Sequence, residues 1–96
     1  MKLGQLGIWA PLDYPIRHFG EKDPGLPSAG ELARFAQRVE ALGYGAIWSP
    51  EGYGRNPLVL SGWMLANTTK LIAATGIASI YARDPMATAS AQKALA

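Results

Sequence analysis

The chain has 96 residues, of which 49% are hydrophobic and 17% are charged, a balance typical of a globular domain and not of a disordered one. Its formal net charge is only +2, and its nine lysines and arginines are scattered without a basic run, so a nucleic-acid partner is not expected. It contains no cysteine, which excludes disulfides, thiolate metal sites and a cysteine nucleophile.

The N-terminal sequence leads directly into a short apolar strand. Residues 3–10 are mostly apolar and end before Pro11, a pattern that predicts a buried strand. No basic segment followed by an apolar one precedes this strand, and the longest apolar stretch, residues 71–82, is too short to cross a membrane. We therefore expect no signal peptide, no membrane association and a cytoplasmic location.

A proline-rich loop is predicted over residues 11–27, which contain four prolines and two glycines. Long connections of this kind often form functional lids or rims. The single histidine, His18, lies in this loop, and its position predicts a surface residue rather than a catalyst. No set of histidine, aspartate and glutamate residues has the spacing of metal ligands, so no metal site is expected.

An amphipathic helix is predicted next. Ser28 and Glu31 match a capping box, in which each side chain accepts a hydrogen bond from the backbone N–H of the other residue. Apolar residues then recur on one helical face, namely Leu32, Phe35, Ala36, Val39 and Leu42. The remaining surface takes the polar side chains, namely Glu31, Arg34, Gln37, Arg38 and Glu40. Gly43 suits the left-handed position that ends a helix.

A second strand and a second helix are predicted over residues 45–50 and 58–67. A glycine-rich connection joins them, with Asn56 as the cap and Pro57 at the first helical position. The helix is apolar nearly all round, so we expect it to be largely buried.

The third strand is predicted over residues 71–80, where almost no polar side chain interrupts the apolar run. This pattern is typical of a parallel strand covered on both faces. Asp84 and Pro85 form a cap and a first helical position, and the alanine-rich residues 86–96 are helical in character. The helical pattern has no terminating signal, which predicts that the natural chain continues.

The resulting order of alternating strands and helices predicts an α/β fold with a parallel sheet and right-handed crossovers. Two architectures fit, an open doubly wound sheet or part of an eightfold barrel. The link after Trp9 contains no Gly-x-Gly-x-x-Gly, and no Walker-type Gly-Lys-Ser/Thr is present. The first strand–helix link therefore argues against a dinucleotide-binding fold.

Four segments carry a resemblance to a known family. Residues 42–52 and residues 69–77, together with Asn56-Pro57 and Arg83-Asp84-Pro85, resemble the luciferase-like monooxygenases and deazaflavin-dependent oxidoreductases. More narrowly, residues 48–52 and 81–85 are similar to oxidoreductases that use coenzyme F420.

The resemblance implies a TIM (β/α)8 barrel with parallel strands, of which residues 1–96 form an incomplete N-terminal portion of about three β/α units. It implies an oxidoreductase that transfers a hydride between an organic substrate and coenzyme F420. An FMN-dependent monooxygenase of the same fold is the alternative. The expected partners are a small-molecule substrate and, in the full-length protein, a second copy in a homodimer. A third possibility is a truncated, non-catalytic fragment that self-associates through exposed strand edges.

In such a barrel the reacting ring lies across the C-terminal ends of the strands, and three places there are candidates. Trp9 would stack on or enclose a flat ring, or be a core tryptophan. Glu51 would accept a hydrogen bond or a proton and is the catalytic candidate; otherwise it is a loop carboxylate or a partner of Arg55. Gly52 stands where many relatives have a histidine, which favours deazaflavin hydride transfer over a luciferase-type mechanism.

The third place is the segment of Thr75, Gly76, Ile77 and Ala78. Relatives carry a bulge and a non-proline cis peptide bond here, and by match this bond would join Gly76 to Ile77. Gly76 would allow the backbone to approach the ring closely. The alternative is a glycine in an ordinary buried strand. The cofactor-binding candidates are therefore Trp9, Glu51, Gly52, Thr75, Gly76, Ile77 and Ala78.

Overall fold

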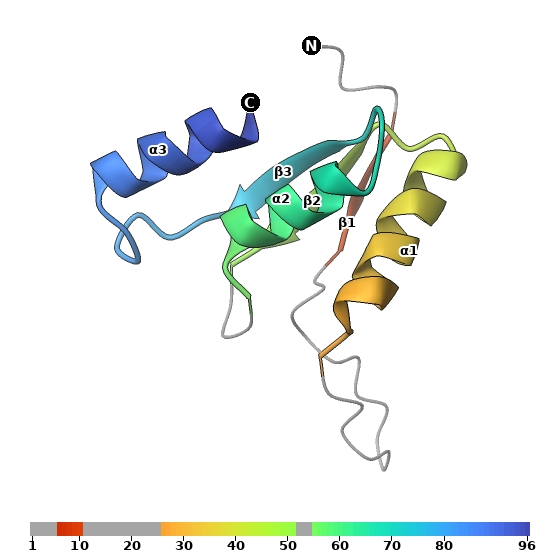
Figure 1. Ribbon diagram of the computed structural model, residues 1–96, viewed down its shortest axis with the longest axis horizontal. Helices are drawn as coiled ribbons and strands as arrows, with labels where there is room; N and C mark the ends of the chain where they lie inside the picture. Colours follow the sequence, from red (N-terminus) through yellow and green to blue (C-terminus); the bar gives the residue numbers. More distant parts are fainter. Residues whose placement is uncertain (1–5, 11–25, 52–54) are drawn as a thin grey trace.

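A computed structural model describes residues 6–10, 26–51 and 55–96. These residues form three strands and three helices in strict alternation (Figure 1): β1 (Gly7–Trp9), α1 (Ala29–Ala41), β2 (Ala46–Pro50), α2 (Pro57–Ala66), β3 (Ile72–Ile77) and α3 (Pro85–Leu95). The predicted element order is confirmed. Most of the predicted proline-rich loop, including His18, lies outside the described residues.

The strands form one parallel sheet in the order β1-β2-β3. Ile8 pairs with Ile47, which pairs with Ala73, and this row packs against the buried core. Since side chains alternate along a strand, the neighbouring row of Trp9, Trp48 and Ala74 belongs to the opposite face. We call this opposite face the open face.

The core lies between the sheet and helices α1 and α2. Its central side chains are fully or almost fully buried, namely Leu32, Ala36, Val39, Ile47, Leu60, Met64 and Leu71. Leu42, expected on the buried face of α1, is instead the exposed residue that caps the helix end. The expectation that α2 is largely buried is also wrong in part, because Val59 is 72% and Trp63 41% exposed. A helix in a single layer buries only the face that it turns toward the sheet.

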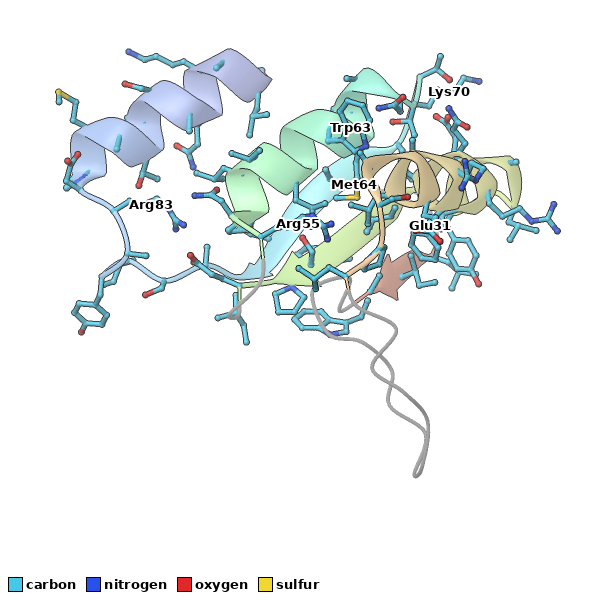
Figure 2. The ribbon with its side chains drawn as sticks, turned by 60° about the horizontal axis from the view of Figure 1, so that its bottom comes forward. Glu31, Arg55, Trp63, Met64, Lys70 and Arg83 are labelled. Atoms are coloured by element: carbon cyan, nitrogen blue, oxygen red, sulfur yellow. The ribbon has the colours of Figure 1, made fainter. Side chains whose placement is uncertain are left out.

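All three helices lie on one side of the sheet (Figure 2). In a doubly wound fold, the right-handed crossover after the third strand leads to the other face, because the strand order reverses there. Here α3 instead packs beside α2, where a β-carbon on Gly62 would lie 3.2 Å from Leu95 Cδ2. The chain therefore has the architecture of consecutive units of a (β/α)8 barrel.

The helix boundaries follow the predicted caps. The Glu31 backbone N–H donates to Ser28 Oγ at 3.2 Å, and the Ser28 N–H donates to Glu31 Oε2 at 2.7 Å. The side chains of Asn56 and Asp84 cap α2 and α3, each followed by a proline. Gly43 has φ 91° after α1, as predicted. No helix in the described ranges is long and apolar enough to span a bilayer.

Glu40 ties α1 to the connection between α2 and β3. Its carboxylate accepts from the backbone N–H groups of Thr69, Lys70 and Leu71 and from the Thr69 hydroxyl. The Lys70 and Thr69 N–H groups hold the pKa of Glu40 below its usual value, against the effect of desolvation. The sequence pattern assigns Glu40 to the solvent-facing side of the helix. It could not reveal this contact, because the contact joins segments about 30 positions apart in the chain.

Glu40→Gln is expected to lower the thermal midpoint at neutral pH. Because the folded pKa of Glu40 is lowered, its carboxylate stabilises the fold above its unfolded pKa, and this contribution is lost as the pH falls through the folded pKa. Circular dichroism melts should show a difference from wild type that narrows in acid. Arg38→Gln, an exposed change on the same helix, serves as the control; an equal effect in Arg38→Gln would contradict the assignment.

Met64→Ala is expected to destabilise the protein by about 2–5 kcal/mol, through lost apolar burial and the cavity that remains. Met64, on the core-facing side of α2, is 0% exposed. Val59→Ala on the exposed side of the same helix should change stability far less. Urea unfolding of both variants measures the difference, and similar losses would contradict the packing described for α2.

Candidate active site

The carboxyl ends of the three strands meet at one edge of the sheet. This edge carries six of the seven predicted cofactor-binding residues, namely Trp9, Glu51, Thr75, Gly76, Ile77 and Ala78. Gly52 lies outside the described residues. The structure thus brings together residues from three separate parts of the chain, as the parallel arrangement predicts.

The Trp9 indole lies against Gly76, two strands away. A β-carbon on residue 76 would overlap the six-membered ring of the indole, so only glycine leaves the ring in this position. Because β2 separates the two strands, the Trp9 side chain must cross the open face of β2. Trp9 remains 52% exposed within the described part of the chain.

Strand β3 contains a bulge at this point. Ser49 pairs with Thr75, and Pro50 pairs with Ile77, which leaves Gly76 as an extra residue. The expected bulge is confirmed. The expected cis bond between Gly76 and Ile77 is wrong, since the described chain contains no cis peptide bond. The bulge itself displaces the backbone at Gly76.

The segment 75–78 is not uniform in the direction of its side chains. Thr75 follows Ala73 by two positions, and Ala73 packs on the helix-covered side, so alternation assigns the Thr75 side chain to that side as well. Gly76 and Ile77 together oppose Pro50, and both are exposed. Any contact of Thr75 with a ligand on the open face is therefore left to its backbone.

Trp48 is a second aromatic residue of the open face, and it is not among the site residues predicted from the sequence. A β-carbon on Gly7 would lie 2.9 Å from Trp48 Nε1, so the Trp48 ring covers Gly7 as the Trp9 ring covers Gly76. The register pairs Trp9 directly with Trp48. The sequence does contain a signal for Trp48, since the pair Ile47-Trp48 in the second strand repeats the pair Ile8-Trp9 in the first.

Glu51 is held by Arg83 and Ser79 at the end of β2. Arg83 Nη2 donates to Glu51 Oε1 at 2.6 Å, and Arg83 Nη1 donates to Oε2 at 3.1 Å. The Ser79 backbone N–H donates to Oε2 at 2.5 Å. The alternative in which Glu51 pairs with Arg55 is wrong, because Glu51 pairs with Arg83 and the Arg55 guanidinium donates to the Pro27 carbonyl.

The hydrogen bonds from Arg83, followed by that from Ser79, lower the pKa of Glu51, whereas partial desolvation acts in the opposite direction. The same pair raises the pKa of Arg83. Glu51 is thus an ionised carboxylate with both oxygens engaged, which is a poor starting point for accepting a proton at neutral pH. A catalytic role for Glu51 stays a prediction.

The open face offers a surface for a flat, aromatic ligand. Trp9 supplies ring surface at the carboxyl end of this face, beside the exposed Gly76 and Ile77, whereas the Trp48 ring lies over Gly7 toward the amino end. Flat rings stack favourably on aromatic side chains. The described ranges contain no group of three or more histidine, aspartate or glutamate side chains that could hold a metal ion. These residues are suited to binding and orienting a ring and to excluding water from one side of it.

Arg83→Gln is expected to raise the pKa of Glu51 toward its ordinary value, because Arg83 is the largest cause of its lowering. The hydrogen bond from the Ser79 N–H should still lower the pKa of Glu51 in part. In wild type the Glu51 contribution to stability is present above its unfolded pKa and is lost as the pH falls through the lowered folded pKa. Side-chain carboxyl NMR titration measures the pKa directly, and an unchanged Glu51 titration would contradict the pairing.

The family model described as luciferase-like monooxygenase matches residues 8–95. No curated protein and no solved structure matches the chain. The matched stretch extends from the first strand through the third helix, and it includes every described residue of the candidate site. The chain belongs to the luciferase-like monooxygenase family.

Proposed function

We propose that the protein is an oxidoreductase that uses coenzyme F420 and transfers a hydride between this cofactor and an organic small molecule. The observation that carries the proposal is the exposed Trp9 indole, seated on the bulge at Gly76 across the carboxyl edge of a barrel-type sheet. A (β/α)8 barrel builds its active site at this edge.

Trp9 and Ile77 would hold the cofactor ring from one side. The glycine at position 76 supports this arrangement, since any side chain there would displace the Trp9 ring. When bound, the deazaflavin would supply the hydride acceptor or donor. The residues of this chain would fix the plane of the ring and keep water from one of its faces.

The choice of F420 over FMN rests on the resemblance and on chemistry. Gly52 replaces the histidine of many relatives, and Glu51 is engaged with Arg83. Neither residue offers a free proton acceptor, so the proton that accompanies the hydride would be exchanged with other groups of the site. The family description itself names monooxygenases, so an FMN-dependent monooxygenase is the second candidate.

The remaining expectations belong to the same proposal. The substrate would be a small molecule bound in the cytoplasm, and the full-length protein would form a homodimer. The alternative of a self-associating fragment has one feature in its favour: within the described chain, β1 and β3 each pair with β2 only. Such outer edges are competent to pair with another strand.

Titration of the purified full-length protein with F420 and with FMN tests the proposal. Binding of F420 should be tighter than binding of FMN and should quench tryptophan fluorescence. Trp9→Ala should weaken F420 binding about tenfold, or ~1.4 kcal/mol, through lost stacking. Trp63→Phe, on helix α2 and on the other side of the sheet (Figure 2), is the matched control.

Three outcomes decide between the candidates. Tighter binding of FMN would transfer the proposal to a monooxygenase with a reductase partner. Binding of neither cofactor would refute the oxidoreductase proposal. Size-exclusion chromatography that shows a stable assembly without cofactor affinity would support the non-catalytic alternative.

A further inference from the structure

We propose that Glu51 and Arg83 form a positioning clamp that holds the β3 bulge, and through it the Trp9 ring, in the arrangement needed for cofactor binding. In this assignment Glu51 is not a proton acceptor. The importance of the clamp for cofactor binding rests on the proposed function, whereas its effect on Trp9 does not.

The clamp ties the connection between β3 and α3 to the end of β2. Arg83 bonds both oxygens of Glu51, and its Nη1 also donates to the Ser79 carbonyl at 3.2 Å. The Ser79 N–H donates to the same carboxylate. The guanidinium and carboxylate side chains are only 11% and 15% exposed. Bidentate contacts of this kind fix geometry as well as adding energy.

Few other contacts hold the segment that follows the bulge. None of residues 76–96 is buried, and Ile77 is 62% exposed. The Glu51 backbone N–H donates to the Ile77 carbonyl at 2.8 Å, which continues the ladder beyond the bulge. A segment with little apolar burial depends on its polar contacts to stay in place. The side chain and the backbone of Glu51 supply most of these contacts.

The clamp is coupled to Trp9 through Gly76. The bulge residue lies between the Ser49–Thr75 pair and the Glu51–Ile77 hydrogen bond. The Trp9 ring rests directly on it. If the hydrogen bonds of Glu51 with Ser79 and Arg83 are lost, the bulge is held only by the pairing that precedes it. The backbone at Gly76, on which the Trp9 ring rests, then moves.

The geometry opposes proton transfer by Glu51. A general base needs an oxygen within hydrogen-bond reach of the proton that it takes, and both oxygens of Glu51 already accept bonds from cationic or backbone donors. Displacing Arg83 would leave an unpaired charge in a largely enclosed place, which is unfavourable.

Fluorine NMR of the full-length protein labelled with 5-fluorotryptophan tests the clamp without any cofactor. The described residues include three tryptophans, Trp9, Trp48 and Trp63, and each resonance is assigned by a Trp→Phe change. Arg83→Gln and Glu51→Gln should shift or broaden the Trp9 resonance at a temperature where the protein is fully folded. The Trp63 resonance should stay in place, and Arg83→Lys should give an intermediate result.

Arg38→Gln, an exposed change on α1, should move none of the resonances. A purely structural pair would lower the thermal midpoint without moving Trp9 in the folded protein, and that result would overturn the proposal. If Arg83→Gln does not fold, Arg83→Lys decides by the same criterion, and an unmoved Trp9 resonance again overturns the clamp.

Cofactor affinity provides the second readout. Arg83→Gln should weaken F420 binding about tenfold, and the double variant Arg83→Gln/Trp9→Ala should bind little worse than either single variant, because both changes act through one contact. Additive losses would overturn the link between clamp and ring. If wild type binds no F420, the proposed function fails, while the fluorine spectra still test the clamp.

Discussion

One row of side chains across the sheet, Ile8, Ile47 and Ala73, packs beneath helices α1 and α2 and decides which face of the sheet stays open. Because successive side chains point to opposite faces, burying this row sends Trp9 and Trp48 to the uncovered side. A slip of one residue would exchange the two rows and bury the tryptophans among the helices. The candidate site therefore depends on the same contact that makes the core.

The open face becomes a site only where it meets the bulge of β3. In regular pairing Gly76 would oppose Pro50 and Ile77 would oppose Glu51; the bulge instead sets Gly76 and Ile77 together opposite Pro50, with Gly76 beneath the Trp9 ring. The bulge in turn is bracketed by backbone pairing on one side and by the Glu51–Arg83 contact on the other. A bulge next to an active site commonly changes the direction of a side chain. Here the side chain that rests on the bulge is Trp9, which belongs to β1 and not to the bulged strand β3.

Each end of β3 is held by a carboxylate from an earlier β/α unit. At the amino end, Glu40 accepts from the backbone of residues 69–71. At the carboxyl end, Glu51 accepts from Ser79 and Arg83. In barrels of this type the amino edge serves stability and the carboxyl edge serves chemistry. The same interaction, a carboxylate receiving backbone N–H groups, thus supports the fold at one edge and the candidate site at the other.

The sequence by itself determined the element order, the capping residues, the parallel sheet and the edge at which the candidate residues meet, because periodicity and caps act over a few neighbouring positions. Only the tertiary structure decided that Trp9 rests on Gly76 and that Glu51 pairs with Arg83, 32 positions away, instead of the nearby Arg55. The partner of a charged side chain depends on which strand ends and loops converge. That convergence follows from the packing of the whole sheet, which no local pattern contains.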